Sequence, residues 1–434
     1  MEDREKDGIG GNPRKYVWFT TLYNARAYYP ILAVLFLDLG LTLDQFVMLN
    51  LVWAATIFIF EVPSGALADT LGRKTLLVAA SVLMVVEMSC LLFAPKDGGW
   101  LLFSLCVANR LLSGLSEAAA SGADEALAYD SMPEENREEA WDELLATAMR
   151  FRSVGFVIAM VIGGLLYDPA IINKTLPDNL EISAELAHRL PVALVLMQAI
   201  ACVSITLGMI EPVRKIGGNA WEASQHAMRL TLKTARWVFT TPRTLAIVVI
   251  GLSIDSIVRN FATINSSYYR MIELPAWSFG FIGAAIGLGG YIVPGIAARL
   301  NKRFSTWTNF AIIAGLALTG LIGVMPGNSY WCLLPAALLM MTMGFLAYTI
   351  SRSLNKAADS SKRATVLSVK GLAFNLGYGL FSLAFSRSLA STEGLGADNA
   401  LRQVLLWQIP YFVIVVGLLL WWGHSRLTSG TATS

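Results

Sequence analysis

Long apolar stretches alternate with short polar segments along almost the whole chain. A helix crosses the hydrocarbon core of a bilayer when it holds about 20 mostly apolar residues. Twelve stretches reach this length, and the longer ones would be tilted. They begin near Tyr16, Leu43, Lys74, Gly99, Asp142, Arg189, Thr244, Trp277, Ser305, Tyr330, Arg363 and Ala400. The pattern predicts an all-α membrane protein with twelve transmembrane helices.

The longest polar segment between these stretches, residues 211–243, separates six helices from six. Its basic residues Arg229, Lys233 and Arg236 stand beside Trp237. Basic residues interleaved with apolar ones are typical of an amphipathic helix on a membrane surface. The expected domains are a first six-helix bundle, a cytoplasmic linker with an amphipathic helix and a second six-helix bundle, at residues 1–211, 212–243 and 244–434.

The two halves also share short sequence matches. A shift of 230 residues places Gly65 over Gly295 and Arg73 over Arg303. Internal repeats of this kind are common in secondary transporters, and the matches favour a duplicated bundle.

If the N-terminus is inside, alternate polar segments lie on the cytoplasmic side of the membrane. These segments hold most of the Lys and Arg residues, above all the N-terminal tail, residues 211–243 and residues 352–363. Because cytoplasmic loops carry the excess of Lys and Arg, both termini are expected in the cytoplasm. We therefore expect a multi-pass protein of the cell (inner) membrane.

Composition supports this interpretation and removes several function classes. Hydrophobic residues make up 55% and charged residues 15% of the 434 positions, whereas a soluble chain carries about 25% charged residues. A net charge of +2 is too small to indicate nucleic-acid binding. The four cysteines lie in apolar stretches without CxxC spacing, so neither a metal site nor a cofactor is expected. No nucleophile–base spacing and no phosphate-binding GxxxxGK[ST] loop occur, so the chain is not expected to be an enzyme or ATP-driven.

The loop between the second and third stretches has a distinctive sequence, GALADTLGRK, at residues 65–74. It contains Gly65, Asp69, Gly72, Arg73 and Lys74. Small residues allow close helix approach, and Asp69 can accept hydrogen bonds at the N-terminus of another helix, where the helix dipole favours an anion.

This loop resembles the signature loop of the major facilitator superfamily, G-x-L-a-D-r-x-G-r-[KR], although Thr70 stands where a basic residue is common. The resemblance implies two six-helix bundles around a midplane cavity and transport by alternating access. It also implies a gating role for the loop. In that family helices one, four, seven and ten line the cavity.

The fourth stretch carries several polar residues with helical spacing. At 100° per residue, Arg110, Gly114, Glu117, Ser121 and Asp124 share an arc of about 80°. Ionisable residues at membrane depth cost free energy and are functional candidates. Arg110, Gly114 and Ala118 also resemble the fourth-helix pattern of proton-coupled members, in which the arginine is tied to proton movement. We expect Arg110, Glu117 and Asp124 to serve proton coupling, with a buried Arg–Glu pair that only joins helices as the alternative.

Two further stretches carry charges near aromatic residues. Arg26 lies about ten residues into the first stretch, with Tyr23 and Tyr29 predicted within about 60° of it on a continuous helix. It could hold an organic anion or pair with an acid such as Glu117. In the seventh stretch Asp255 and Arg259 are four residues apart, which predicts an ion pair on one face. The candidate cavity and substrate residues are Tyr23, Arg26, Tyr29, Asp255 and Arg259.

Three more charges lie within apolar stretches. Glu61 and Lys370 stand at similar depths in the second and eleventh stretches, which pack together in the family, so an ion pair between the bundles is predicted. The alternative is that Lys370 faces the substrate. Glu87 has no predicted partner.

The sequence as a whole predicts a secondary active transporter that moves a small organic solute and is coupled to protons. Its expected partners are that solute, protons and the lipid bilayer, and it is expected to act as a monomer. An efflux pump for drugs or amphiphiles and a non-transporting membrane sensor are the alternatives. The fifth stretch has Gly155, Gly163 and Gly164 but lacks the proline of the family's antiporter signature, which weighs against drug–proton exchange.

Overall fold

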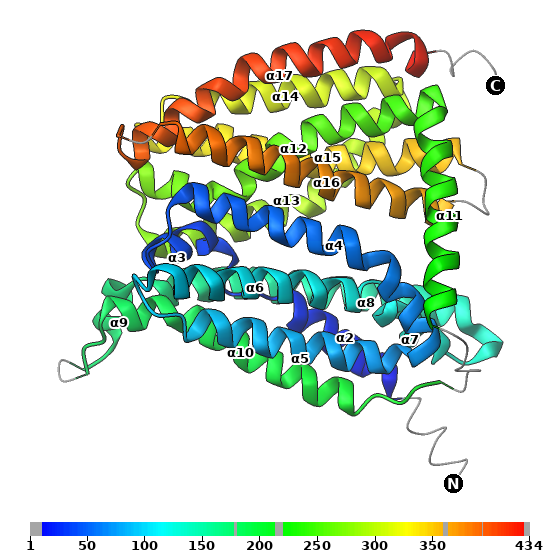
Figure 1. The fold of residues 1–434 in the computed structure, drawn as a ribbon, viewed down its shortest axis with the longest axis horizontal. Helices are drawn as coiled ribbons and strands as arrows, with labels where there is room; N and C mark the ends of the chain where they lie inside the picture. The colour runs from blue at the N-terminus through cyan, green and yellow to red at the C-terminus, as the bar shows by residue number, and fades with distance from the viewer. Residues whose placement is uncertain (1–10, 178–179, 213–219, 359–362, 393, 429–434) are drawn as a thin grey trace. The chain divides into compact units, whose positions relative to one another are not determined.

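The computed structural model describes residues 11–177, 180–212, 220–358, 363–392 and 394–428 (Figure 1). The long helices of the N-terminal half are α4 (Leu43–Leu71), α5 (Arg73–Leu92), α6 (Gly99–Ala120), α8 (Arg137–Tyr167) and α10 (Ala184–Leu207). Those of the C-terminal half are α12 (Pro242–Met271), α13 (Ala276–Arg303), α14 (Thr306–Val324), α15 (Leu333–Ala357), α16 (Arg363–Ala390) and α17 (Ala397–Thr428). Shorter helices are α2 (Asn12–Asn24), η1 (Tyr29–Ile31), α3 (Leu32–Asp38), α7 (Ala123–Asp130), η2 (Glu134–Asn136), α9 (Pro169–Thr175) and η3 (Tyr330–Cys332).

Eleven helices in the described part of the chain are long and apolar enough to cross a membrane. The predicted first span accounts for the remaining segment, but it is not one helix. It is divided into α2, η1 and α3, with a break at residues 25–28. Pro30 accounts for part of the break, because proline has no N–H to donate to the carbonyl four residues earlier, that of Arg26, and its ring would clash with that carbonyl in a continuous helix. The all-α membrane fold is confirmed, whereas the prediction of a continuous first helix was wrong.

The chain forms two compact units. Unit 1 comprises Met1–Leu41, Thr56–Met228 and Pro275–Ala285, and unit 2 comprises Thr42–Ala55, Arg229–Leu274 and Ile286–Ser434. Three helices, α4, α11 (Ala220–Thr240) and α13, therefore each contribute a portion to both units.

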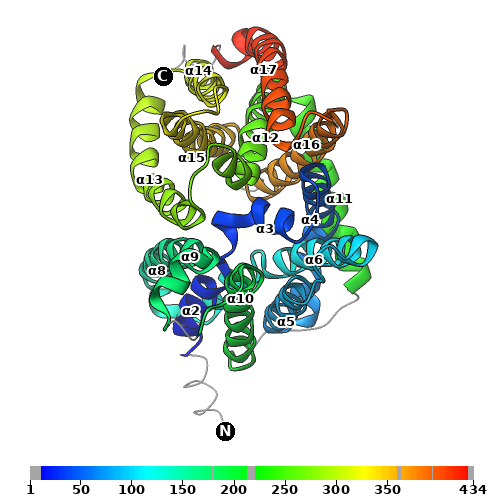
Figure 2. The same cartoon turned by 90° about the vertical axis from the view of Figure 1, so that its left-hand side faces the viewer.

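Unit 1 brings the broken first segment close to α8. Within this unit α5 packs against α6 and α10, and α2 packs against α8 (Figure 2). At Gly163 of α8, a Cβ atom would lie 1.7 Å from the carbonyl oxygen of Ala27. Only glycine permits this approach, which fixes the position of the break and of Arg26 within it.

Unit 2 is built around α12, which contacts α14, α15, α16 and α17. The helices α14 and α17 lie side by side (Figure 1). The first part of α4 belongs to this unit and packs on α16, where Ser386 Oγ donates a hydrogen bond to the carbonyl of Asp44 at 2.9 Å.

A helix also occupies the polar segment between the halves, α11 (Ala220–Thr240). Its basic residues Arg229, Lys233 and Arg236 are exposed and lie on one face at spacings of four and three. The attachment of this face to a membrane surface stays a prediction.

Candidate functional site

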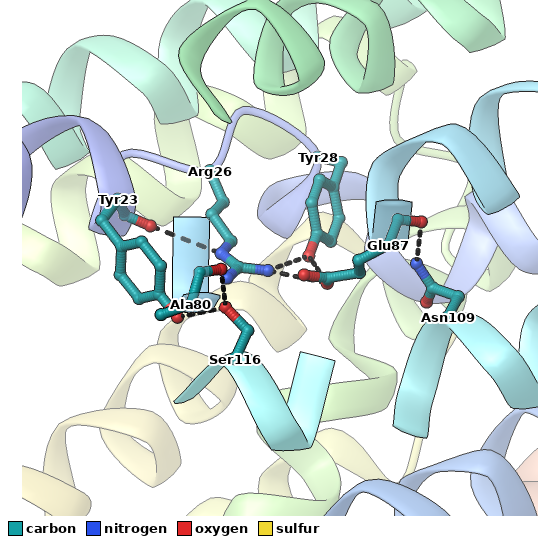
Figure 3. Close-up of polar contacts among 7 residues, drawn as sticks. All are labelled: Tyr23, Arg26, Tyr28, Ala80, Glu87, Asn109 and Ser116. Carbon is teal, nitrogen blue, oxygen red and sulfur yellow. Dashed lines mark hydrogen bonds and ion pairs between the residues drawn. The ribbon is translucent and has the colours of Figure 1, made fainter. Parts of the chain in front are cut away.

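A buried ion pair lies at the break in the first segment of unit 1 (Figure 3). Arg26 Nη1 lies 2.8 Å from Glu87 Oε1, and the two residues are 4% and 0% exposed. Arg26 Nη1 also donates to the Tyr28 hydroxyl at 3.0 Å. Glu87 is fourteen residues into α5, about 21 Å from its start, so the pair is deep in the predicted span.

Hydrogen bonds from α2 and α6 surround this pair (Figure 3). The hydroxyls of Tyr23 and Ser116 are 2.6 Å apart, and Ser116 Oγ donates to the carbonyl of Ala80 at 2.8 Å. Asn109 Nδ2 donates to the backbone carbonyl of Glu87 at 2.9 Å. The network ties α2, α5 and α6 together around the ion pair and holds the backbone of α5 at Glu87.

The surroundings of Arg26 differ from those predicted on a continuous helix. The chain leaves helical geometry after Asn24, so Tyr28 rather than Tyr29 contacts the guanidinium, and Tyr29 is 38% exposed. Tyr23 keeps its predicted place beside Arg26, whose Cζ lies 5.4 Å from the ring centroid. Of the two alternatives for Arg26, the structure shows pairing with an acid, and that acid is Glu87 rather than Glu117, the example considered from the sequence.

Arg110 is the second buried arginine of unit 1. It lies in the middle of α6, is 6% exposed, and places its Cζ 4.8 Å from the centroid of the Phe36 ring. Its Nε and Nη2 atoms have no hydrogen-bond partner among the described residues. These two donors lie on one edge of the guanidinium, the fork that binds a carboxylate through two parallel hydrogen bonds.

The predicted single polar face of the fourth span is wrong in its last part. The helix α6 ends at Ala120, Ser121 has a ψ of 113°, and Gly122 has a φ of 73°. A glycine with positive φ at this position commonly ends a helix. Asp124 therefore lies on α7, where its Oδ1 accepts from the backbone N–H of Glu125 at 2.8 Å, and not on the face of Arg110. Glu117 is on α6 and is exposed.

In unit 2 the predicted pair on the seventh span is confirmed. Arg259 Nη2 lies 2.7 Å from Asp255 Oδ2 on α12. Arg259 Nη1 donates to Asn375 Oδ1 at 3.0 Å, and its Cζ lies 5.4 Å from the centroid of the Tyr378 ring. Both of these neighbours come from α16.

The signature loop forms contacts within unit 1. Arg73 Nη1 donates to the carbonyl of Ala126 at 2.5 Å and pairs with Asp130 of α7. The backbone N–H groups of Arg73 and Lys74 donate to the Glu211 carboxylate at 3.0 and 2.6 Å, which caps the start of α5. A carboxylate here satisfies N–H groups that have no partner within the helix.

The structure also gives the positions of Gly65 and Gly72 of the signature loop and of the two residues of the predicted inter-bundle pair. Gly65 is exposed in α4, and Gly72 separates α4 from α5. The side chain of Asp69 lies outside the described part of the structure. Glu61 is on α4 in unit 1 and Lys370 is on α16 in unit 2, so their pairing stays a prediction.

Several residues of these networks were not anticipated from the sequence. Tyr28, Asn109 and Glu211 carried no motif that distinguished them, and Asn375 and Tyr378 lie far along the chain from Arg259. Glu87 did carry a signal, because a charge in an apolar span requires a partner. Matching it with Arg26, another intramembrane charge of the same half, would have found the pair.

The chain is similar to several proteins named for transport or drug resistance. It is 23% identical over 309 residues to the quinolone resistance protein NorA of Staphylococcus aureus, and the match covers 70% of each chain. In structure it is similar to the nucleoside transporter NupG, with a TM-score of 0.71, 11% identity and coverage of 96% of this chain and 98% of that one. It is also similar to a bacterial homolog of the human lysosomal transporter Spinster, with a TM-score of 0.68, 13% identity and 100% coverage of both. At such identities the two structures establish the fold alone.

The family model of the Major Facilitator Superfamily matches residues 17–382, which is most of the chain. This match agrees with the fold, the eleven long apolar helices in the described residues and the loop at residues 65–74. The protein belongs to the major facilitator superfamily and is a transporter rather than an enzyme.

Proposed function

We propose that this protein is a secondary active transporter that moves a small organic anion by alternating access, coupled to protons. The observation that carries the proposal is Arg110, a buried guanidinium whose Nε and Nη2 have no partner among the described residues. Leaving such donors unpaired in an apolar region costs free energy, and a bound carboxylate removes that cost. Arg26 does not offer the same opportunity, because Glu87 already neutralises it.

The neighbourhood of Arg110 favours an anion with an aromatic or apolar body. The Phe36 ring centroid lies 4.8 Å from Arg110 Cζ, so an aromatic side chain stands close to the guanidinium that would hold the ligand. A planar aromatic carboxylate combines the two features, with a charge for the fork and a ring for the apolar contact.

Two carboxylates support proton coupling. Glu117 is exposed on the same helix as Arg110, seven residues away. Glu87 is fully buried, and its Oε2 has no hydrogen-bond partner in the described part of the chain. Glu117 is the first choice for the titrating group, because an exposed carboxylate can exchange protons with water during each cycle.

The substrate proposal is tested with purified protein in liposomes, with and without a proton gradient directed into the liposomes. Labelled benzoate is compared with benzamide, which has the same shape but no charge. We expect saturable benzoate uptake that rises with the gradient and exceeds the rate in protein-free liposomes, and no saturable benzamide uptake. Equal transport of both compounds would overturn the anion proposal, and no flux of any solute in a wider screen would favour a sensor.

Replacing Glu117 tests the coupling site. In Glu117→Gln the carboxyl cannot titrate, so we expect the stimulation of benzoate uptake by the pH gradient to disappear. Exchange of labelled for unlabelled benzoate at equal pH should persist, because it needs no net proton movement. The control Glu139→Gln removes an exposed carboxylate at the start of α8 and should behave as the parent. Full gradient stimulation in Glu117→Gln would assign coupling to another group.

Export of drugs is the second candidate function, favoured by the similarity to NorA, which is named for quinolone resistance. A quinolone such as norfloxacin, loaded into cells with and without the protein, distinguishes the two. Faster norfloxacin loss from expressing cells, together with no benzoate transport, would favour efflux.

The signature loop is proposed to control the change between inward- and outward-open states, from a cytoplasmic position with both termini on the same side of the cell membrane. Asp69→Asn is expected to slow benzoate transport several-fold while leaving benzoate affinity unchanged, because the loop is remote from Arg110. Thr70→Val is the matched control, since the hydrogen bonds of Thr70 Oγ1 among the described residues go to carbonyls of its own helix, at 3.0 Å to Ala66 and 3.3 Å to Leu67. A parental turnover rate in Asp69→Asn would remove the gating role.

A further inference from the structure

A cavity of about 480 Å³ lies in unit 2 between α12, α16 and α17. Its wall includes Ser256 of α12, Phe381 and Phe385 of α16, and Trp407, Gln408 and Tyr411 of α17. Trp407 and Tyr411 are 44% and 45% exposed, so the cavity opens on the outside of the unit. The volume is within the range of sites for small organic ligands, about 300–1,000 Å³.

Gln408 is the unusual residue in this wall. It is 5% exposed, and neither its amide nitrogen nor its amide oxygen has a hydrogen-bond partner among the described residues. It lies eleven residues into α17, about 17 Å from the start of a helix long enough to span the membrane. A buried amide with both groups unpaired costs free energy, and a ligand that donates one hydrogen bond and accepts another removes that cost.

The other residues of the wall define what the ligand must be. None of the described residues that line the cavity is Asp, Glu, Lys, Arg or His, which disfavours a charged ligand. The aromatic rings present an apolar surface, with Phe381 and Tyr411 centroids 5.9 Å apart. The three serine hydroxyls of the wall, those of Ser253, Ser256 and Ser388, each donate to a carbonyl of their own helix. Gln408 is therefore the buried polar side chain of this wall that has both of its groups unpaired among the described residues.

We propose that this cavity binds a neutral amphiphile, a molecule with an apolar body and one hydroxyl or primary amide group that pairs with the Gln408 side chain. The site is separate from Arg110, which belongs to unit 1, and it does not depend on the transported solute being an anion. The ligand has two possible sources with the same chemistry, a neutral lipid of the bilayer or a neutral solute from water.

Fluorescence quenching at Trp407 tests this proposal. The full-length protein is placed in phosphatidylcholine nanodiscs and titrated with a monoacylglycerol whose chain carries bromine atoms, which quench nearby tryptophans. The difference between the parent and Trp407→Phe isolates the signal of Trp407. We expect saturable quenching by the monoacylglycerol, and only linear quenching by the brominated fatty acid methyl ester, which cannot donate a hydrogen bond.

Substitution of Gln408 gives the decisive comparison. Gln408→Leu should weaken monoacylglycerol binding about tenfold, the effect of losing one to two hydrogen bonds. Gln403→Leu makes the same change at an exposed position of the same helix and should bind as the parent does. The melting temperature of ligand-free Gln408→Leu should not fall, because the lost amide had no protein partner.

Further variants separate the outcomes. Ala384→Phe fills the cavity from α16 while Gln408 itself is kept, and it should also abolish saturable quenching. Competition by water-soluble 2-phenylacetamide would identify a solute as the ligand, whereas competition by unlabelled monoacylglycerol alone would identify a lipid. Parental affinity in Gln408→Leu, or non-saturable quenching in the parent protein, would overturn the proposal.

Discussion

The Glu87→Leu variant is expected to lose about 3–5 kcal/mol of unfolding free energy, because it leaves the Arg26 guanidinium buried without a counter-charge. Arg26 is 4% exposed, and Glu87 Oε1 is the acidic oxygen 2.8 Å from it. The Tyr28 hydroxyl stays within reach but carries no charge to balance the guanidinium. Unfolding is measured in mixed micelles by increasing the fraction of SDS and following helical circular dichroism.

The double variant Arg26→Met with Glu87→Leu removes both charges and should recover at least half of the lost stability, since apolar residues of similar volume often replace a buried ion pair at little cost. The control is Glu185→Leu, whose partner Arg189 lies 3.0 Å away on the surface of α10. The Glu185 side chain is 56% exposed and that of Arg189 21%, and an ion pair open to solvent in this way contributes at most about 1 kcal/mol. The single variant Arg26→Met is measured as well. If the double variant loses as much unfolding free energy as Glu87→Leu and Arg26→Met lose together, the charges are not coupled.

The membrane fold could be predicted because its signal is local. Each span is a run of apolar residues long enough to cross a bilayer, and this requirement depends on no distant part of the chain. The Asp255–Arg259 pair was predictable for the same reason, because side chains four residues apart on one helix lie next to each other. Arg26 and Glu87 are 61 residues apart, and their contact depends on how the break packs against α5.

The two wrong predictions share a physical cause. Both treated a continuous apolar stretch as a continuous helix. Both then used the helical rotation of 100° per residue to place side chains that lie beyond a break in the helix. Pro30 ends the helical geometry of the first segment, and Gly122 ends α6 with a positive φ. Both signals are visible in the sequence, since proline and glycine are the residues that most often interrupt helices. Giving them priority over hydropathy would have separated Asp124 from Arg110 and removed the reason to place Tyr29 beside Arg26.

Replacing Arg110 should have the largest effect on transport. In Arg110→Gln we expect benzoate affinity to fall about a hundredfold, since the fork provides charge-assisted hydrogen bonds of about 1.5–3 kcal/mol each. Arg110→Lys keeps the charge but loses the fork, and should have an intermediate affinity. Arg150→Gln is the control, because Arg150 is exposed on α8. The measurement is the concentration dependence of benzoate uptake in liposomes.

Stability distinguishes this arginine from Arg26. Arg110 Nε and Nη2 have no partner among the described residues, and its contact with Phe36 is of the kind that contributes about 0.5–2 kcal/mol. Arg110→Gln should therefore unfold within about 1–2 kcal/mol of the parent, in contrast to Glu87→Leu. A large loss of stability would show that Arg110 holds helices together rather than binds a ligand.

A role in proton movement alone would give a different pattern from substrate binding. If Arg110 only guides protons, Arg110→Gln should lose gradient-driven uptake but keep the exchange of labelled for unlabelled benzoate at equal pH, which moves no net proton. If Arg110 binds the carboxylate, gradient-driven uptake and exchange should fall together, because benzoate must bind to the Nε–Nη2 edge of Arg110 in both. We expect the second pattern, and intact exchange in a well-folded Arg110→Gln variant would assign the residue to coupling instead.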